Sequence, residues 1–127
     1  MVEAIVAVVL LGIGLVGAIA MQARSMSALA DSGMRAEATI AADRLIGMMT
    51  LDAANASAYA LASGGTAGAP LQPWYADTRT RIPGAQIEVK VAPAANRTRV
   101  EINIAWTRKT GAAASAHHVT AYLAPTA

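Results

Sequence analysis

The chain has 127 residues, of which 55% are hydrophobic and only 14% are charged, and its formal net charge is +2. The charged fraction lies well below the roughly 25% of an ordinary soluble domain, which argues against both a disordered chain and a typical soluble enzyme. The absence of cysteine excludes disulfides, a thiol nucleophile and a cysteine-ligated zinc site. No run of Lys or Arg is present, so we expect no nucleic-acid partner.

The N-terminal segment is the most apolar part of the chain. Residues 4–21 form 18 consecutive positions without a charged or strongly polar side chain. As a helix they would span about 27 Å, close to the thickness of a bilayer core. A cleaved signal peptide is the alternative, but no basic residue precedes the run and no clear cleavage site follows it. We therefore predict a retained membrane helix over residues 1–22.

Two features of this segment indicate contact with other helices. Glu3 lies at the edge of the apolar run, where it would either reach the lipid headgroups or pair with a positive group of another subunit. Gly12, Gly14 and Gly17 are either ordinary glycines of a membrane helix, or they provide a face for close helix packing or a point where the helix loosens. Glu3 is thus the candidate subunit-pairing residue, and the three glycines are candidate helix-packing positions.

The helical pattern continues in one-sided form over residues 23–52. Apolar residues recur there at spacings of three and four, as one buried stripe requires. The stripe consists of Met34, Ala38, Ala41, Leu45 and Met48. Together with the membrane segment it predicts one helix of about 50 residues, far longer than the average of about 11–12. Residues 53–73 are rich in Ala, Ser, Gly and Pro, which predicts a flexible connection.

The last part of the chain predicts a short helix and a small sheet. Trp74, Thr78 and Ile82 share one helical face over residues 74–82. Over residues 86–124 the period changes to alternation, which predicts an antiparallel sheet of about three to four strands. Its apolar positions are Ile87, Val89, Val91, Val100, Ile102, Ile104, Trp106, Val119, Ala121 and Leu123. Because the amphipathic half of the long helix is the obvious cover for this apolar face, we predict an α+β fold.

The sequence contains no catalytic constellation. His117 and His118 are its two histidines, and neighbours in a strand point to opposite faces, so they are poorly placed to share a metal ion. There is no serine-nucleophile motif, and Gly64-Gly65 lacks the lysine of a phosphate-binding loop. We expect no enzymatic activity, cofactor or metal. We expect Trp106 to be a core residue rather than a binding aromatic.

Residues 1–25 resemble the start of type IV pilin-like proteins, in which a Glu precedes an apolar helix. Further details resemble the PilV-type minor pilins. They are residues 11–17 (LGIGLVG), residues 22–24 (QAR), residues 42–45 (ADRL), Trp74 ahead of Pro83-Gly84, and Trp106 at the end of a strand. The likeness covers residues 1–52 well and the remainder loosely. Family members carry a short basic leader ending in Gly, then a methylated aromatic residue before the Glu, so we expect the natural chain to begin upstream of Met1.

The resemblance implies a pilin-like fold, with residues 1–22 in the inner membrane and later in the filament core, and residues 23–127 as a periplasmic domain. It implies a minor pilin that takes part in type IV pilus assembly, priming or a tip complex at the cell surface. Its partners would be other minor pilins, the major pilin and a prepilin peptidase. In the filament Glu3 would pair with the N-terminal amine of a neighbouring subunit. The alternatives are a minor pseudopilin of a type II secretion system and a single-pass periplasmic binding module.

Overall fold

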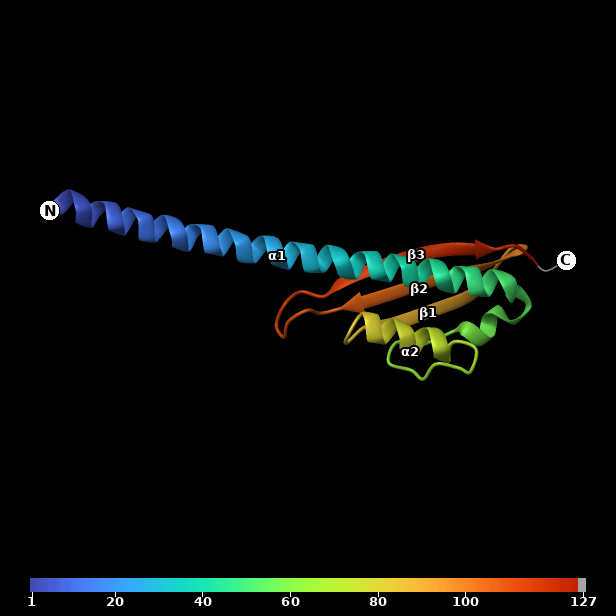
Figure 1. Cartoon of the computed structure of the whole chain (residues 1–127). Helices are drawn as coiled ribbons and strands as arrows, with labels where there is room; N and C mark the ends of the chain where they lie inside the picture. Colours follow the sequence, from blue (N-terminus) through green and yellow to red (C-terminus); the bar gives the residue numbers. More distant parts are fainter. Residues whose placement is uncertain (126–127) are drawn as a thin grey trace. The chain divides into compact units, whose positions relative to one another are not determined.

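A computed structural model describes residues 1–125 as two α-helices, a short 3₁₀ helix and one antiparallel sheet (Figure 1). The helices are α1 (Val2–Leu51) and α2 (Gln72–Arg81), with the 3₁₀ helix η1 (Ala53–Tyr59) between them. The strands β1 (Gln86–Ala94), β2 (Arg97–Trp106) and β3 (Ser115–Leu123) pair in the order β1-β2-β3. The chain divides into two compact units, residues 1–33 and a second unit that begins at Met34.

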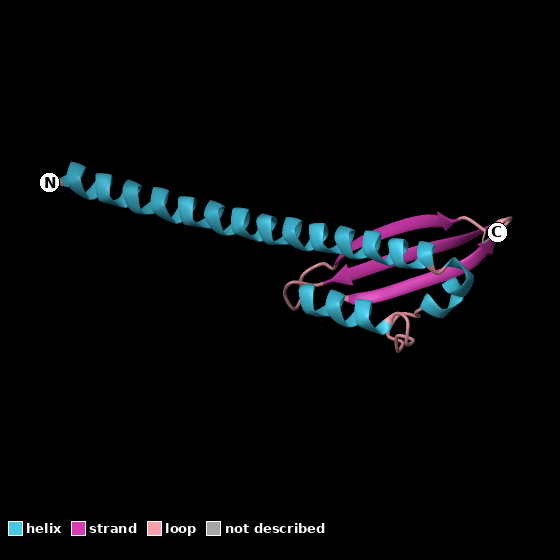
Figure 2. Cartoon of the chain, turned by 45° about the vertical axis from the view of Figure 1, so that its right-hand side comes forward, coloured by secondary structure: helices cyan, strands magenta, loops and turns pink. Residues whose placement is uncertain are grey.

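The second unit has the predicted α+β architecture, in which the C-terminal part of the long helix packs on a three-stranded sheet. This part of α1 and the whole of α2 lie on one face of the sheet (Figure 2). The residues that α1 buries there are Ala38, Ala41, Ala42, Leu45 and Met49. Met34 and Met48 are partly buried against the same core, so the helical stripe predicted from the sequence is confirmed.

The sheet is apolar on one face and polar on the other, as the alternating pattern predicted. The central and first strands supply most of the buried side chains, which are Ile87, Val89, Val100, Ile102, Ile104 and Trp106. The edge strand β3 adds Leu123, which is buried, and Val119, which is partly buried. On the opposite face Lys90 Nζ lies 3.4 Å from Glu88 Oε2, and Arg99 pairs with Glu101.

The compact second unit begins at Met34, whereas the predicted boundary after residue 22 separates the apolar segment from the amphipathic part of the helix. The first buried residue of α1 is Ala38, and the unit starts at Met34. The length of the sheet explains the difference. Strands of nine or ten residues are about 30 Å long, and residues 34–51 of a helix span about 27 Å. The drop in apolar composition after residue 22 therefore marks where the surface of the helix changes from apolar all round to apolar on one side. The length of the sheet determines where the helix becomes buried.

The connection over residues 53–73 is more ordered than its composition predicted. Part of it forms η1, and the Tyr59 hydroxyl donates to Asp52 Oδ2 at 3.1 Å. Burial, and then the hydrogen bond and charge of Asp52, raise the pKa of Tyr59. Leu61 is buried and exchanges two backbone hydrogen bonds of 2.9 Å with Val89 of β1. A local hydrogen bond to Asp52 and the distant pairing with β1 together hold the segment in place.

The indole of Trp74 joins α2 to α1. Trp74 is buried, and its Nε1 donates to the carbonyl oxygen of Ala41 at 2.8 Å. Thr78 and Ile82 are buried as well, which confirms the predicted face. The helix begins at Gln72 rather than at residue 74, because a proline in the first turn loses no helical hydrogen bond. Trp106 is buried as predicted, but its Nε1 has no hydrogen-bond partner among residues 1–125.

Replacing each tryptophan by phenylalanine should separate the hydrogen bond from the loss of indole volume. Trp74→Phe removes both, whereas Trp106→Phe removes a similar volume from a side chain whose Nε1 is unpaired. We expect Trp74→Phe to lower the free energy of unfolding by about 1 kcal/mol more than Trp106→Phe, the usual net value of a hydrogen bond. Denaturant titration of the full-length chain in detergent, followed by circular dichroism, measures both. An equal or larger loss in Trp106→Phe would contradict the role of the indole contact.

Candidate functional site

The most unusual surface of the protein is the apolar surface of the first unit, residues 1–33. None of these residues is buried in the structure, and α1 contains a stretch long and apolar enough to cross a membrane. Val9, Leu15 and Ile19, for example, are 54%, 57% and 65% exposed. Soluble proteins rarely present so extended an apolar surface to water. Such a surface is typical of a segment that lipid or other chains cover.

Glu3 and two of the three candidate glycines share one face of α1. At about 100° per residue, Gly14 lies about 20° from Glu3 around the helix axis and Gly17 about 40°. Within residues 1–22, three more residues lie within about 40° of Glu3, at spacings of three and four along the chain. We call the complete set the Glu3 face, and it consists of Glu3, Ala7, Leu10, Gly14, Gly17 and Met21.

The glycines of this helix are not required by contacts within the chain. Apart from the chain neighbours and the nearby backbone of the helix itself, no atom of residues 1–125 lies within 4 Å of the position that a Cβ atom would take at Gly12, Gly14 or Gly17. Gly12 lies about 160° from Gly14, so it is not part of the Glu3 face. The structure thus brings together two of the three predicted glycines. Glu3 lies in the first turn, where the positive end of the helix dipole favours a carboxylate.

The two histidines point to opposite faces of β3, as the strand periodicity predicted. His117 is half-buried and pairs in register with Ile104, whereas His118 is exposed. Within residues 1–125, no three His, Asp or Glu side chains come together in a way that could hold a metal ion. The histidines therefore offer no chemistry beyond that of single side chains.

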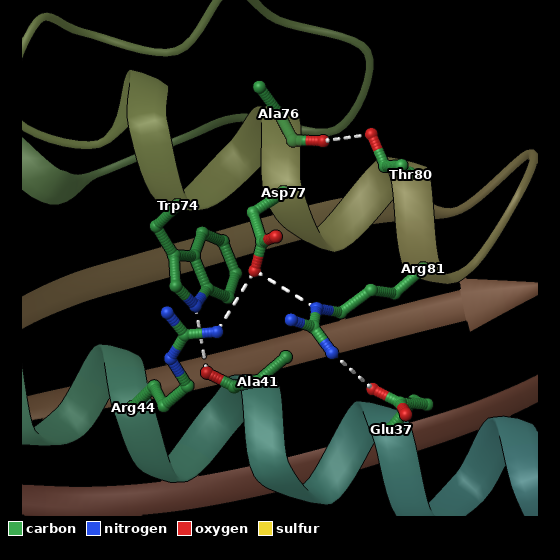
Figure 3. Close-up of polar contacts among 8 residues, drawn as sticks. All are labelled: Glu37, Ala41, Arg44, Trp74, Ala76, Asp77, Thr80 and Arg81. Carbon is green, nitrogen blue, oxygen red and sulfur yellow. Dashed lines mark hydrogen bonds and ion pairs between the residues drawn. The ribbon is translucent and has the colours of Figure 1, made fainter.

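A polar contact between α2 and α1 was missed by sequence reasoning (Figure 3). Asp77 Oδ2 accepts hydrogen bonds from Arg44 Nη1 at 2.9 Å and from Arg81 Nε at 3.1 Å. Arg81 Nη1 also lies 3.6 Å from Glu37 Oε2. We call these four residues the charge cluster. Their side chains are between 38% and 55% exposed, so the cluster orients α2 more than it stabilises the fold.

The charge cluster changes the protonation of Asp77. Burial acts to raise the pKa of this carboxyl, but hydrogen bonds and positive charge from Arg81 and Arg44 outweigh it, so the pKa lies below its ordinary value of 3.8. The folded state therefore favours the carboxylate. The resulting stabilisation is full above the unfolded pKa and is lost as the pH falls through the lower folded pKa.

Comparison with known proteins leaves the site unassigned. No protein-family model matches the chain, and searches of the curated proteins and of the solved structures give no match either. Function is therefore inferred from the residues and their geometry. Hydropathy was enough to find the apolar segment and Glu3. It could not find the pairing of Arg44 with Asp77, because these residues lie 33 positions apart and belong to no shared local pattern.

Asp77→Asn should remove part of the acid sensitivity of the fold. Wild-type protein loses the contribution of Asp77 below about pH 3.8, whereas the amide of the variant does not titrate in this range. We expect the variant to be less stable than wild type at pH 6 but to lose less stability on acidification to pH 3.

Asp43→Asn is the matched control, because Asp43 is exposed and has no side-chain hydrogen bond or ion pair with any described residue. It should behave as wild type when unfolding of the full-length chain in detergent is measured at both pH values. Equal acid sensitivity of wild type and Asp77→Asn would rule out the stabilising role of the charge cluster.

Proposed function

We propose that this chain is a minor pilin of a type IV pilus, held in the inner membrane by residues 4–21 before it enters the filament. The observation that carries the proposal is the exposed apolar half of α1, which continues without a break into the half that covers the sheet. A helix of this kind can keep its conformation in lipid and in a filament, because its backbone hydrogen bonds are internal in both environments.

Assembly would exchange one apolar environment for another. In the membrane, acyl chains cover the side chains of residues 4–21, and in a filament the same segments of neighbouring subunits would cover them. The apolar area removed from water is similar in the membrane and in the filament. Hydrophobic burial alone therefore favours no particular arrangement of neighbouring subunits. Selection must come from close packing and from polar pairing, which lipid tails cannot provide.

The Glu3 face would provide both. An unpaired carboxylate is costly in an apolar filament core, so an axial register that pairs Glu3 with the N-terminal amine of a neighbour is preferred. Gly14 and Gly17 lie on the same side of the helix and lack side chains, which allows a neighbouring helix to approach closely. The Glu3 face would therefore set the register between subunits.

The second unit would contact other minor pilins and the major pilin from the periplasmic side and later at the cell surface. Its solvent-facing sheet surface carries exposed polar and charged side chains, as suits a surface for specific contacts rather than a further hydrophobic core. A role in priming assembly or in a tip complex follows from the resemblance of the N-terminal region to minor pilins. No catalytic function is proposed.

Glu3→Ala and Gly14→Leu should each reduce incorporation into filaments at least about tenfold. For Glu3→Ala the reason is that removing one partner of a buried ion pair costs roughly 3–5 kcal/mol. For Gly14→Leu the added side chain would separate the packed helices. Gly12→Leu is the matched control, because it adds the same side chain at an equally open position outside the Glu3 face.

Each variant is introduced into the chromosomal gene, and the chain is quantified in sheared filaments relative to the membrane fraction. An unchanged amount in the membrane shows that the variant folds and inserts. Normal incorporation of Glu3→Ala would disprove the pairing role of Glu3, and equal defects in Gly12→Leu and Gly14→Leu would disprove the Glu3 face. If deleting the gene abolishes protein secretion but leaves piliation intact, the chain is a type II secretion pseudopilin instead.

A further inference from the structure

The helix α2 has two polar flanks, of which only one is neutralised. On the flank toward α1, Asp77 and Arg81 belong to the charge cluster. On the other flank, Arg79 lies 5.6 Å above the ring centroid of Tyr75, and its Nη1 donates to the Tyr75 hydroxyl at 3.4 Å. Within residues 1–125, no carboxylate pairs with Arg79. This flank therefore carries the uncompensated positive charge of Arg79, whose side chain is held in position by the ring of Tyr75.

Arg79 and Tyr75 line a cleft of about 310 Å³ between α2, the turn at residues 63–64 and the start of β1. Its remaining lining combines a small apolar part with polar groups. Ala85 and Ile87 are buried, whereas Ser63 and Gln86 are exposed and make no side-chain hydrogen bond with a described residue. The cleft thus gathers one guanidinium, two hydroxyls and a carboxamide around a small volume.

We propose that this cleft binds a carboxylate group. The guanidinium carries five N–H donors in a planar fork that matches the two oxygens of a carboxylate. Contact with the Tyr75 ring restrains the Arg79 side chain, which reduces the conformational entropy lost on binding. The hydroxyls of Ser63 and Tyr75 and the amide of Gln86 are additional neutral donors.

The charge of the cleft favours a monoanion. One positive charge with neutral donors is matched by a carboxylate, whereas a phosphate group carries about 1.5 to 2 negative charges at pH 7. Two sources can present the group to the cleft: a small acidic sugar, or the side chain of an Asp or Glu on a neighbouring protein. The binding chemistry is the same for both. The proposal is independent of pilus assembly, because it uses no residue of the Glu3 face.

The test is an NMR titration of the full-length, ¹⁵N-labelled chain in detergent micelles. The probes are glucuronate, N-acetylglutamate methylamide, glucose and inorganic phosphate. Both carboxylates should shift the amide signals of residues 63–64, 79 and 86–87, and glucose, the uncharged counterpart of glucuronate, should not. Tighter binding of glucuronate assigns a sugar as the source, and tighter binding of the glutamate derivative assigns a protein side chain.

Arg79→Gln should weaken carboxylate binding at least about tenfold, because it removes a charge-assisted hydrogen bond. Arg97→Gln is the control, since Arg97 pairs with Ala94 at the other end of the β1–β2 ladder. Tyr75→Phe keeps the ring and removes one donor, so it should cause a smaller loss. Four results would each overturn the proposal: no shift with either carboxylate, equal shifts with glucose, tighter binding of phosphate than of the carboxylates, or unchanged binding by Arg79→Gln.

Discussion

Burial of one stripe of α1 under the sheet is the contact on which the rest of the fold depends. Three of its five buried residues are alanines, Ala38, Ala41 and Ala42, so the larger side chains of this core come mainly from the sheet and α2, among them Ile104, Trp106 and Trp74. A small sheet with one apolar face is not stable in water without such a cover. The chain has no cysteine and hence no disulfide, so the second unit is held by this helix–sheet core and the segments that pack against it.

The same contact explains how the remaining segments are used. Because the strands are only nine or ten residues long, the sheet can cover about 27–30 Å of helix, and α1 is about 75 Å long at 50 residues. α2, bonded through Trp74 and the charge cluster, completes the layer beside α1, and Leu61 covers part of the β1 edge. Residues 1–33 form a separate unit in which no residue is buried.

Elements in which apolar residues recur at a regular spacing were predictable from the sequence. Elements that depend on contacts outside their own residues were not. The α1 stripe, the α2 face and the three strands follow from spacings of three, four and two. The 3₁₀ helix at residues 53–59 has an Ala-rich sequence in which apolar residues recur at no regular spacing. It is held by the hydrogen bond from Tyr59 to Asp52 and, just after its end, by the pairing of Leu61 with Val89. Glu3 could be found because it is a lone charge beside an apolar run. The cleft at Arg79 could not, because it forms only when the turn at residues 63–64 meets α2 and β1.

Whether the first half of α1 lies in an apolar environment while its second half faces water can be measured directly with spin labels. The chain lacks cysteine, so single spin labels can be attached at Val9→Cys, Leu15→Cys, Ile40→Cys and Leu51→Cys. All four residues are more than half exposed, so a label displaces no internal contact. In lipid vesicles, labels at residues 9 and 15 should collide with dissolved oxygen and be shielded from a water-soluble nickel chelate, and labels at residues 40 and 51 should be accessible to the chelate. Equal accessibility of all four positions to the nickel chelate would contradict this arrangement.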